Sequence, residues 1–188
     1  MPLNNALSFS HQLLEPTIQL GDTVVDATVG QGNDTRFLAA RVGKTGHVLA
    51  FDIQQAALDE TATMLTLTGL RPQVALIHDG HEHLVDHIND NTMISAAMFN
   101  LGYLPGGDHS LITRGQTTIA ALQTCCDHLR RGGLITIVVY TGHPGGQTEA
   151  DLVTDFVRHL PQKQFQVLHY GFINQQHQPP YLLAIEKR

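Results

Sequence analysis

Four residues in the first third of the chain have the types and spacing of a ligand-binding turn. Asp26 and Asp34 flank the glycines Gly30 and Gly32. The two glycines permit a tight turn in which a ligand can approach the backbone. Asp34 would stand at the start of a helix, where backbone N–H groups otherwise attract phosphate. A carboxylate at that place repels phosphate, so the pattern favours a ligand that carries positive charge.

A turn of this kind is compatible with two nucleotide-like ligands, a dinucleotide and S-adenosylmethionine. The dinucleotide fingerprint has a third glycine where this chain has Thr35. The sulfonium and ammonium groups of S-adenosylmethionine suit the carboxylates, and Asp52 can accept hydrogen bonds from the ribose hydroxyls of either cofactor. The residues therefore favour S-adenosylmethionine. An NAD-dependent enzyme and a noncatalytic nucleotide-binding module are the alternatives.

The elements that must position these residues alternate between strands and helices. Apolar and β-branched runs predict strands over 23–27, 47–52, 74–78, 94–100, 134–140, 165–170 and 181–186. Amphipathic stretches predict helices over 5–14, 34–41, 54–67, 83–87, 113–129 and 148–160, with Gly132 and Gly133 ending the fifth. This alternation predicts a mostly parallel sheet with helices on both faces. The last two strands have no helix between them, so we expect one of them to run antiparallel.

Composition limits the class of protein. The 188 residues are 42% hydrophobic and 15% charged, which indicates one globular domain over residues 1–188. We expect no membrane segment and no secretory signal. Adjacent Cys125 and Cys126 indicate core residues in a reducing compartment, so a cytoplasmic location is expected. The net charge of −6 argues against a broad nucleic-acid surface but leaves room for a small RNA footprint.

Five sequence strings carry a resemblance to a known family. They are DATVGQGNDTRFLA (26–39), FDIQ (51–54), FNLGYLPGGD (99–108), VVYTGHPGG (138–146) and GFINQQHQPPYLLAIEK (171–187). The first two are typical of class I S-adenosylmethionine-dependent methyltransferases. The last three resemble a small bacterial family labelled rRNA methylases, which includes a tRNA wobble-uridine methyltransferase. The resemblance implies a Rossmann-like, seven-stranded class I methyltransferase fold.

The same resemblance implies a reaction and a set of partners. The reaction is methylation of the primary amine of 5-aminomethyl-(2-thio)uridine in tRNA, which gives 5-methylaminomethyl-(2-thio)uridine at the wobble position. The implied partners are a tRNA anticodon stem-loop and a second copy of the chain in a homodimer. Methylation of an amino nitrogen in rRNA or in a small molecule on the same fold is the alternative.

The resemblance also assigns the strand-end residues to parts of the cofactor. Residues for the methionine end are Asp26, Thr28, Gly30, Gly32, Asn33 and Asp34. Residues for ribose and adenine are Asp52, Gln54, Gly80 and His81. No metal is expected, because His81-Glu82-His83 lacks the spacing of a zinc-binding helix.

The loop after the fourth strand is similar in position to the Asn/Asp-Pro-Pro-Tyr loop of methyltransferases that act on amino nitrogens. By this similarity Asn100 would hold the acceptor nitrogen, and it would also border the cofactor. Tyr103 would pack on the uracil, although Leu101 and Gly102 separate it from Asn100 and depart from that pattern. The amine must lose a proton before it attacks, and Tyr140 and His143 are the favoured proton acceptors among the loop residues.

Overall fold

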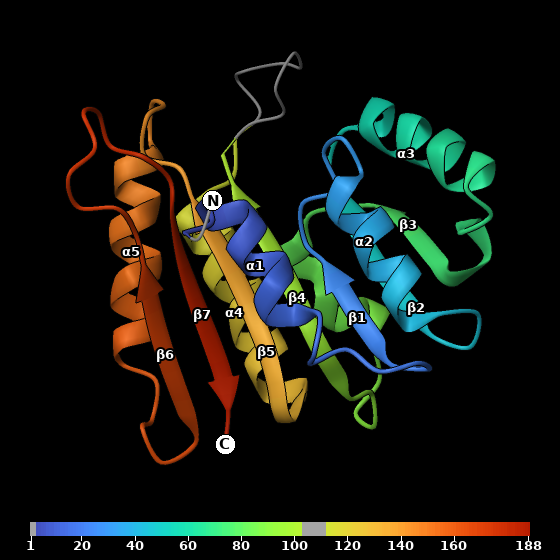
Figure 1. Ribbon diagram of the computed structural model, residues 1–188. Coiled ribbons are helices and arrows are strands. Elements are labelled where there is room, and N and C mark those ends of the chain that lie inside the picture. Colours follow the sequence, from blue (N-terminus) through green and yellow to red (C-terminus); the bar gives the residue numbers. More distant parts are fainter. Residues whose placement is uncertain (1–2, 103–111) are drawn as a thin grey trace.

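The computed structural model describes residues 3–102 and 112–188 of the chain. Its centre is one seven-stranded sheet with the strand order β3-β2-β1-β4-β5-β7-β6 (Figure 1). The strands are β1 (Thr23–Asp26), β2 (His47–Asp52), β3 (Val74–His78), β4 (Ile94–Leu101), β5 (Leu129–Val139), β6 (Phe165–Tyr170) and β7 (Tyr181–Lys187). Strands β1 to β5 pair in parallel, whereas β7 runs antiparallel to both β5 and β6. The expected mostly parallel sheet, with one of the last two strands antiparallel, is confirmed, and the antiparallel strand is β7.

Helices cover both faces of the sheet and make a three-layer α/β fold. The helices α1 (Ala6–Leu14), α2 (Asn33–Val42) and α3 (Gln55–Leu67) pack on one face. The other face carries η2 (His81–His87), α4 (Gly115–His128) and α5 (Gly146–Arg158). A single turn, η1 (Arg71–Gln73), precedes β3. Successive side chains along a strand point to opposite faces of the sheet, so the strands contribute to the core on each face. Val24 packs on the face covered by α1, α2 and α3, and Val25 packs on the face covered by η2, α4 and α5.

The segment between α4 and β5 differs from the sequence prediction. Helix α4 ends at His128, and Gly132 and Gly133 lie inside β5 rather than ending the helix. The pairing of β4 with β5 is irregular there, because Ile94 lies opposite Leu129 whereas Ala96 lies opposite Leu134. Gly132 takes a positive φ of 70°, which suits a bulge in the longer strand. The diglycine therefore accommodates extra residues in a strand.

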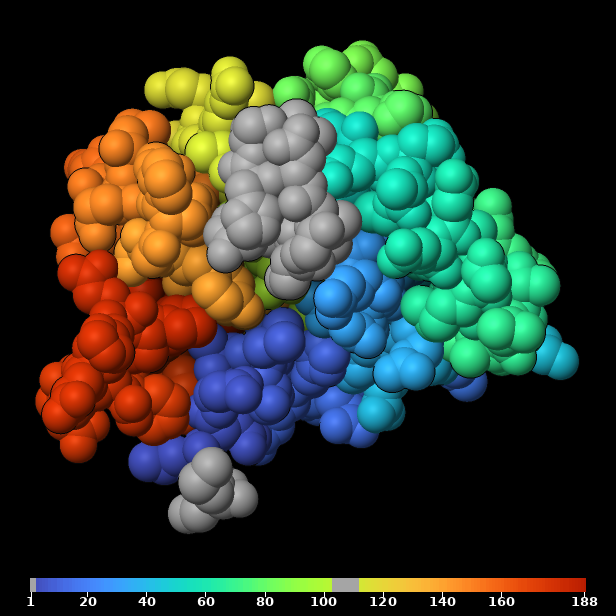
Figure 2. All heavy atoms as spheres, turned by 90° about the horizontal axis from the view of Figure 1, so that it is seen from above, coloured from blue at the N-terminus to red at the C-terminus, as the bar shows by residue number. Residues whose placement is uncertain are grey.

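The carboxyl ends of the parallel strands all lie at the same end of the sheet. The turn after β1, the end of β2, the turn after β3 and the end of β4 meet there, which is where open α/β sheets bind ligands. Seen from above in Figure 2, this end of the molecule brings together α1, the start of α2, α3 and the loop before α5. The chemistry expected from the sequence is therefore gathered at one place.

Candidate functional site

A pocket of about 570 Å³ lies at the carboxyl ends of β1 to β5. This volume is within the range of small-molecule and cofactor pockets. Most of the residues expected at the cofactor line it, namely Thr28, Gly30, Asn33, Asp34, Asp52, Gln54, Gly80, His81 and Asn100. Tyr140 and His143 line it as well. The pocket thus combines the loops that the sequence singled out.

The glycine turn is tied to the end of β2 by Asp52. One carboxylate oxygen of Asp52 accepts from the N–H of Gly30 at 2.8 Å, and the other accepts from the N–H of Gln54 at 2.9 Å. Gly30 has a φ of 51°, a conformation that glycine adopts without strain. Asp52 therefore shapes the turn with its two oxygens, and each oxygen keeps a lone pair that a ribose hydroxyl can use.

Gly32 faces away from the pocket. It has a φ of 74°, and a Cβ at this position would lie 2.5 Å from Oγ1 of Thr61 on α3. Its missing side chain lets α2 and α3 approach each other closely. The structure thus places Gly32 where α2 packs against α3 and not among the residues that line the pocket, and its expected contact with the cofactor stays a prediction.

Asp26 is also absent from the pocket lining, because its side chain is fully buried beneath the turn. Its oxygens accept from the Thr28 N–H at 3.1 Å and from the Thr35 hydroxyl at 2.5 Å. Burial, and then the nearby charge of Asp34, raise the pKa of Asp26 to about 7. Asp26 therefore stabilises the turn from inside and does not line the pocket, and its expected place at the methionine end of the cofactor stays a prediction. Thr35, which stands where the dinucleotide fingerprint has its third glycine, is the residue whose hydroxyl donates to the buried Asp26.

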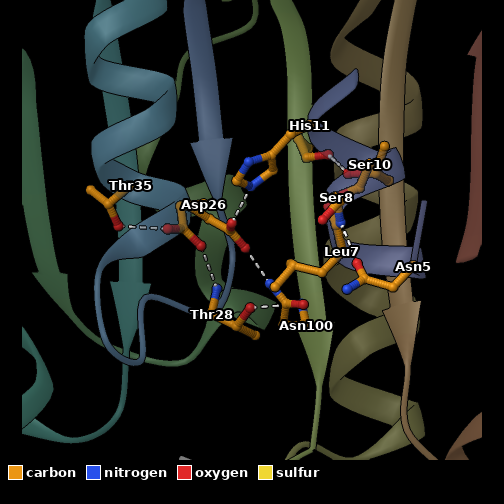
Figure 3. A network of polar contacts seen from close by, with 12 residues as sticks. Asn5, Leu7, Ser8, Ser10, His11, Asp26, Thr28, Thr35 and Asn100 are labelled. Carbon is orange, nitrogen blue, oxygen red and sulfur yellow. Dashed lines mark hydrogen bonds and ion pairs between the residues drawn. The ribbon is translucent and has the colours of Figure 1, made fainter. Parts of the chain in front are cut away.

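Asn100 is held from two sides at the end of β4. Its backbone N–H donates to Oγ1 of Thr28 at 2.8 Å, and its side-chain Nδ2 donates to Oδ2 of Asp34 (Figure 3). A carboxylate can only accept, so Nδ2 must be the atom that faces Asp34. The other amide atom, Oδ1, is buried and has no hydrogen-bond partner among the described residues. Asn100 thus presents a hydrogen-bond acceptor that a bound N–H group would satisfy.

The turn after β3 supplies a neutral histidine. Nδ1 of His81 lies 2.9 Å from the Ala27 carbonyl oxygen, which makes Nδ1 the donor. Burial lowers the pKa of His81, so the ring stays neutral with its lone pair on Nε2. That nitrogen is buried without a hydrogen-bond partner in the described part of the chain. Next to it, Gly80 and Asp79 complete this side of the pocket.

The two expected proton acceptors differ in their suitability. Burial, and then the charge of Asp34, raise the pKa of the Tyr140 phenol, so its hydroxyl stays protonated and donates rather than removes a proton. The ring of His143 lies between two glycines, and its Nδ1 is 3.1 Å from the Pro144 carbonyl oxygen. His143 is therefore better suited than Tyr140 to accept a proton. Tyr103, the remaining expected catalytic residue, lies outside the described residues.

Several residues at the site were not predicted from the sequence, and three of them are Leu7, His11 and Arg114. Leu7 and Arg114 line the pocket, and His11 binds Asp34. Leu7 and His11 belong to α1, which precedes the methyltransferase-like motifs in the chain. No local sequence pattern signals that this helix packs beside the glycine turn. Its amphipathic character indicated only that it is a helix with one buried face.

The charges around the pocket are predominantly negative. Four carboxylates among its described lining residues, Asp34, Asp52, Asp79 and Glu82, stand against one cation, Arg114. Asp34 lies in the first turn of α2, as the sequence predicted, and its side chain is buried. This charge pattern disfavours a pyrophosphate and suits a cationic ligand. In residues 3–102 and 112–188, no group of three or more His, Cys, Asp or Glu side chains could hold a metal.

The helices of the described residues are short. None of the helices within the described ranges has the length and apolar character needed to cross a bilayer. The longest of the α-helices, α4, has 14 residues, short of the ~20 that a bilayer crossing needs.

Comparisons with known proteins agree with this geometry. Residues 48–186 match the family described as "Putative rRNA methylase". A structure described as a "putative rRNA-methylase" from Clostridium thermocellum is 46% identical and has a TM-score of 0.97 over 100% of both chains. A "putative methyltransferase" from Streptococcus mutans, solved in complex with SAH, is 38% identical with a TM-score of 0.90 over 99% of both chains.

A curated relative carries a more specific name. It is the chloroplastic tRNA (mnm5s2U34)-methyltransferase of Arabidopsis thaliana, which is 38% identical over 177 residues. The alignment covers 90% of this chain and 65% of the relative. The chain therefore spans less than two thirds of that protein's length.

Proposed function

The chain belongs to the rRNA-methylase family of class I methyltransferases, and we propose that it is an S-adenosylmethionine-dependent N-methyltransferase that modifies the wobble uridine of tRNA. The expected substrate group is the primary amine of 5-aminomethyl-(2-thio)uridine. The observation that carries the proposal is the buried Oδ1 of Asn100, an acceptor held at the end of β4 without a partner among the described residues.

The pocket fits S-adenosylmethionine, the cofactor of this family. When bound, this cofactor supplies a methyl group on a positively charged sulfur. Asp34 gives the methionine end a buried carboxylate, and Asp52 offers its oxygens to the ribose hydroxyls. The neutral His81 and the backbone of Gly80 would border adenine. A dinucleotide would instead place its pyrophosphate against Asp34, which is electrostatically unfavourable.

Asn100 would position the acceptor nitrogen. A neutral primary amine has two N–H groups and one lone pair. If Oδ1 of Asn100 accepts from one N–H, the lone pair can point toward the methyl group, and the N–C bond forms as the S–C bond breaks. Positioning of this kind is a major source of rate in a displacement reaction.

The amine must also lose a proton, because alkylammonium groups titrate near 10. Desolvation in the pocket favours the neutral amine. His143 is the proposed proton acceptor, directly or through water, and Tyr140 would donate a hydrogen bond or pack against the base. The assignment to tRNA rests on the name of the Arabidopsis relative and on the sequence resemblance.

The homodimer, the cytoplasmic location and the contact with the anticodon stem-loop stay predictions, because neither the described residues nor the relatives test them. An rRNA substrate is the second candidate, and the names of the family and of the Clostridium thermocellum structure favour it.

The direct test is methyl transfer from labelled S-adenosylmethionine to tRNA that carries 5-aminomethyl-2-thiouridine. We expect the label in 5-methylaminomethyl-2-thiouridine after digestion to nucleosides and mass spectrometry. The same tRNA with an unmodified wobble uridine is the matched control and should gain no label. Label that enters rRNA and leaves the modified tRNA unchanged would select the second candidate.

A further inference from the structure

His11 on α1 is connected to the proposed acceptor site through a carboxylate. Its Nε2 lies 2.5 Å from Oδ1 of Asp34. Oδ2 of the same carboxylate accepts from Nδ2 of Asn100. Figure 3 shows His11 reaching from α1 toward this network, with Asn100 below it. An imidazole, a carboxylate and a carboxamide thus follow one another from α1 to the end of β4.

The chemistry of these groups fixes their hydrogen-bond directions. An ionised carboxylate accepts only, so Nε2 of His11 must carry a hydrogen toward Oδ1 of Asp34. With Oδ1 held in this way, Oδ2 is directed at Asn100, and the carboxamide must turn Nδ2 toward it. Oδ1 of Asn100 is consequently left as the buried acceptor. The position of His11 therefore fixes where the Asp34 carboxylate lies, and that carboxylate determines which amide atom of Asn100 the pocket presents.

His11 itself is held in place by packing. Its ring stacks on Phe37 of α2, with 4.2 Å between the centroids and 8° between the planes. Helix α1 is capped by Asn5, whose side chain accepts from the Ser8 N–H, and it is anchored by Phe9, whose ring lies 4.3 Å from that of Tyr170 on β6. The Asp34 side chain is only 6% exposed, so it has little water with which to exchange partners. The network is thus preorganised by contacts outside the pocket.

We propose that His11 is a positioning residue for methyl transfer, which holds Asp34 so that Oδ1 of Asn100 faces the acceptor nitrogen. The inference rests on the proposed function. His11 touches neither substrate nor cofactor in this role. Its loss should therefore change the turnover rate more than the binding of either ligand.

Two substitutions separate the N–H donor from the packing of the ring. His11→Phe keeps an aromatic ring to stack on Phe37 but has no donor, whereas His11→Gln keeps an N–H donor at a similar reach. We expect H11F to lower kcat roughly 10-fold or more, because small displacements of reacting groups are costly. H11Q should recover much of that loss. The control His47→Phe changes an exposed histidine at the start of β2 and should keep the wild-type kcat.

The readouts are kcat, KM for modified tRNA and Kd for S-adenosylhomocysteine by calorimetry. We expect KM and Kd of H11F within about 2-fold of wild type while kcat falls. An unchanged kcat in H11F would overturn the inference, as would an H11Q variant as slow as H11F. Equal losses in kcat and in S-adenosylhomocysteine binding would show a general structural role and would overturn it too.

Crystal structures of the wild type and both variants with S-adenosylhomocysteine provide a readout besides activity. The side chains of Asp34 and Asn100 should rotate in H11F and keep their wild-type positions in H11Q. Unchanged positions in H11F would refute the inference even if kcat fell. If the wild type fails to methylate tRNA, the proposed function fails, and these structures still decide whether His11 orients Asn100.

Discussion

The carboxylate of Asp52 accepts a hydrogen bond from the backbone N–H of Gly30, with 2.8 Å between oxygen and nitrogen. This contact joins the end of β2 to the glycine turn after β1. The same carboxylate binds the N–H of Gln54 at the start of α3. Asp52 therefore shapes the cofactor pocket as well as lining it, and its removal should affect the pocket in two ways.

Asp52→Ala should weaken the binding of S-adenosylhomocysteine. The variant loses the acceptors for ribose and releases the turn at Gly30. Hydrogen bonds to a charged group contribute about 1.5–3 kcal/mol, which corresponds to roughly 10- to 100-fold in Kd. Calorimetry measures this change. Asp59→Ala removes an exposed carboxylate on α3 and is the matched control, with wild-type affinity expected. An unchanged Kd in D52A would exclude the assigned role.

Asp26→Asn should change how stability depends on pH. Burial raises the pKa of Asp26 to about 7, well above the unfolded value of 3.8. The folded state then holds its proton more tightly than the unfolded state. As pH rises from about 4 to about 7, the free energy of unfolding therefore falls, by an amount on the order of a few kcal/mol. Asn has no proton to lose, and its amide can still accept from Thr28 and donate to Thr35.

We expect D26N to be more stable than the wild type at pH 8 and to lose this advantage toward pH 4. Urea denaturation at several pH values gives the difference in unfolding free energy directly. Asp90→Asn changes an exposed carboxylate and should give a small difference that varies little with pH. A D26N difference that is the same at every pH would contradict the raised pKa.

Local sequence patterns predicted strands and helices correctly where tertiary packing requires the same element that the pattern favours. The β-branched runs predicted the strands, and the glycine turn with Asp34 at the start of the following helix was placed correctly. The diglycine at 132–133 was misassigned, because a glycine pair marks a helix end and a strand bulge equally well. The register between β4 and β5 decides whether the glycine pair ends a helix or forms a bulge. That register depends on pairing between residues far apart in the sequence.

The site was predicted less completely than the fold, for two physical reasons. Asp26 stands next to the turn in sequence, but a strand alternates its side chains, and this one points into the interior toward Thr35. His11 is 23 residues from Asp34, and its place depends on how α1 packs against α2 and the sheet. Sequence proximity thus suggested a place in the pocket lining for Asp26, which the structure buries beneath the turn, and distance along the chain hid the contact between His11 and Asp34.

Asn100→Ala should slow methyl transfer while leaving cofactor binding nearly unchanged. The variant loses the buried Oδ1 that is expected to hold the acceptor nitrogen, and a preorganised polar group of this kind is worth roughly 100-fold in kcat. Single-turnover transfer to modified tRNA measures the rate, and calorimetry measures the affinity for S-adenosylhomocysteine. Asn89→Ala in an exposed turn is the control. Wild-type turnover by N100A would remove Asn100 from the mechanism.

Gly146→Ala should damage the wall of the pocket formed by His143. A Cβ at Gly146 would lie 2.8 Å from both Nε2 of His143 and the carbonyl oxygen of Tyr140. Because a backbone atom must shift, the strain should outweigh the better helix propensity of alanine and cost about 1–3 kcal/mol. We expect a Tm lower by roughly 2–10 °C, together with slower methyl transfer. At Gly142 a Cβ would meet nothing within 4 Å, so Gly142→Ala should melt and react like the wild type. If G146A and G142A have the same Tm and the same rate of methyl transfer, the space left by Gly146 is not required to hold His143 in place.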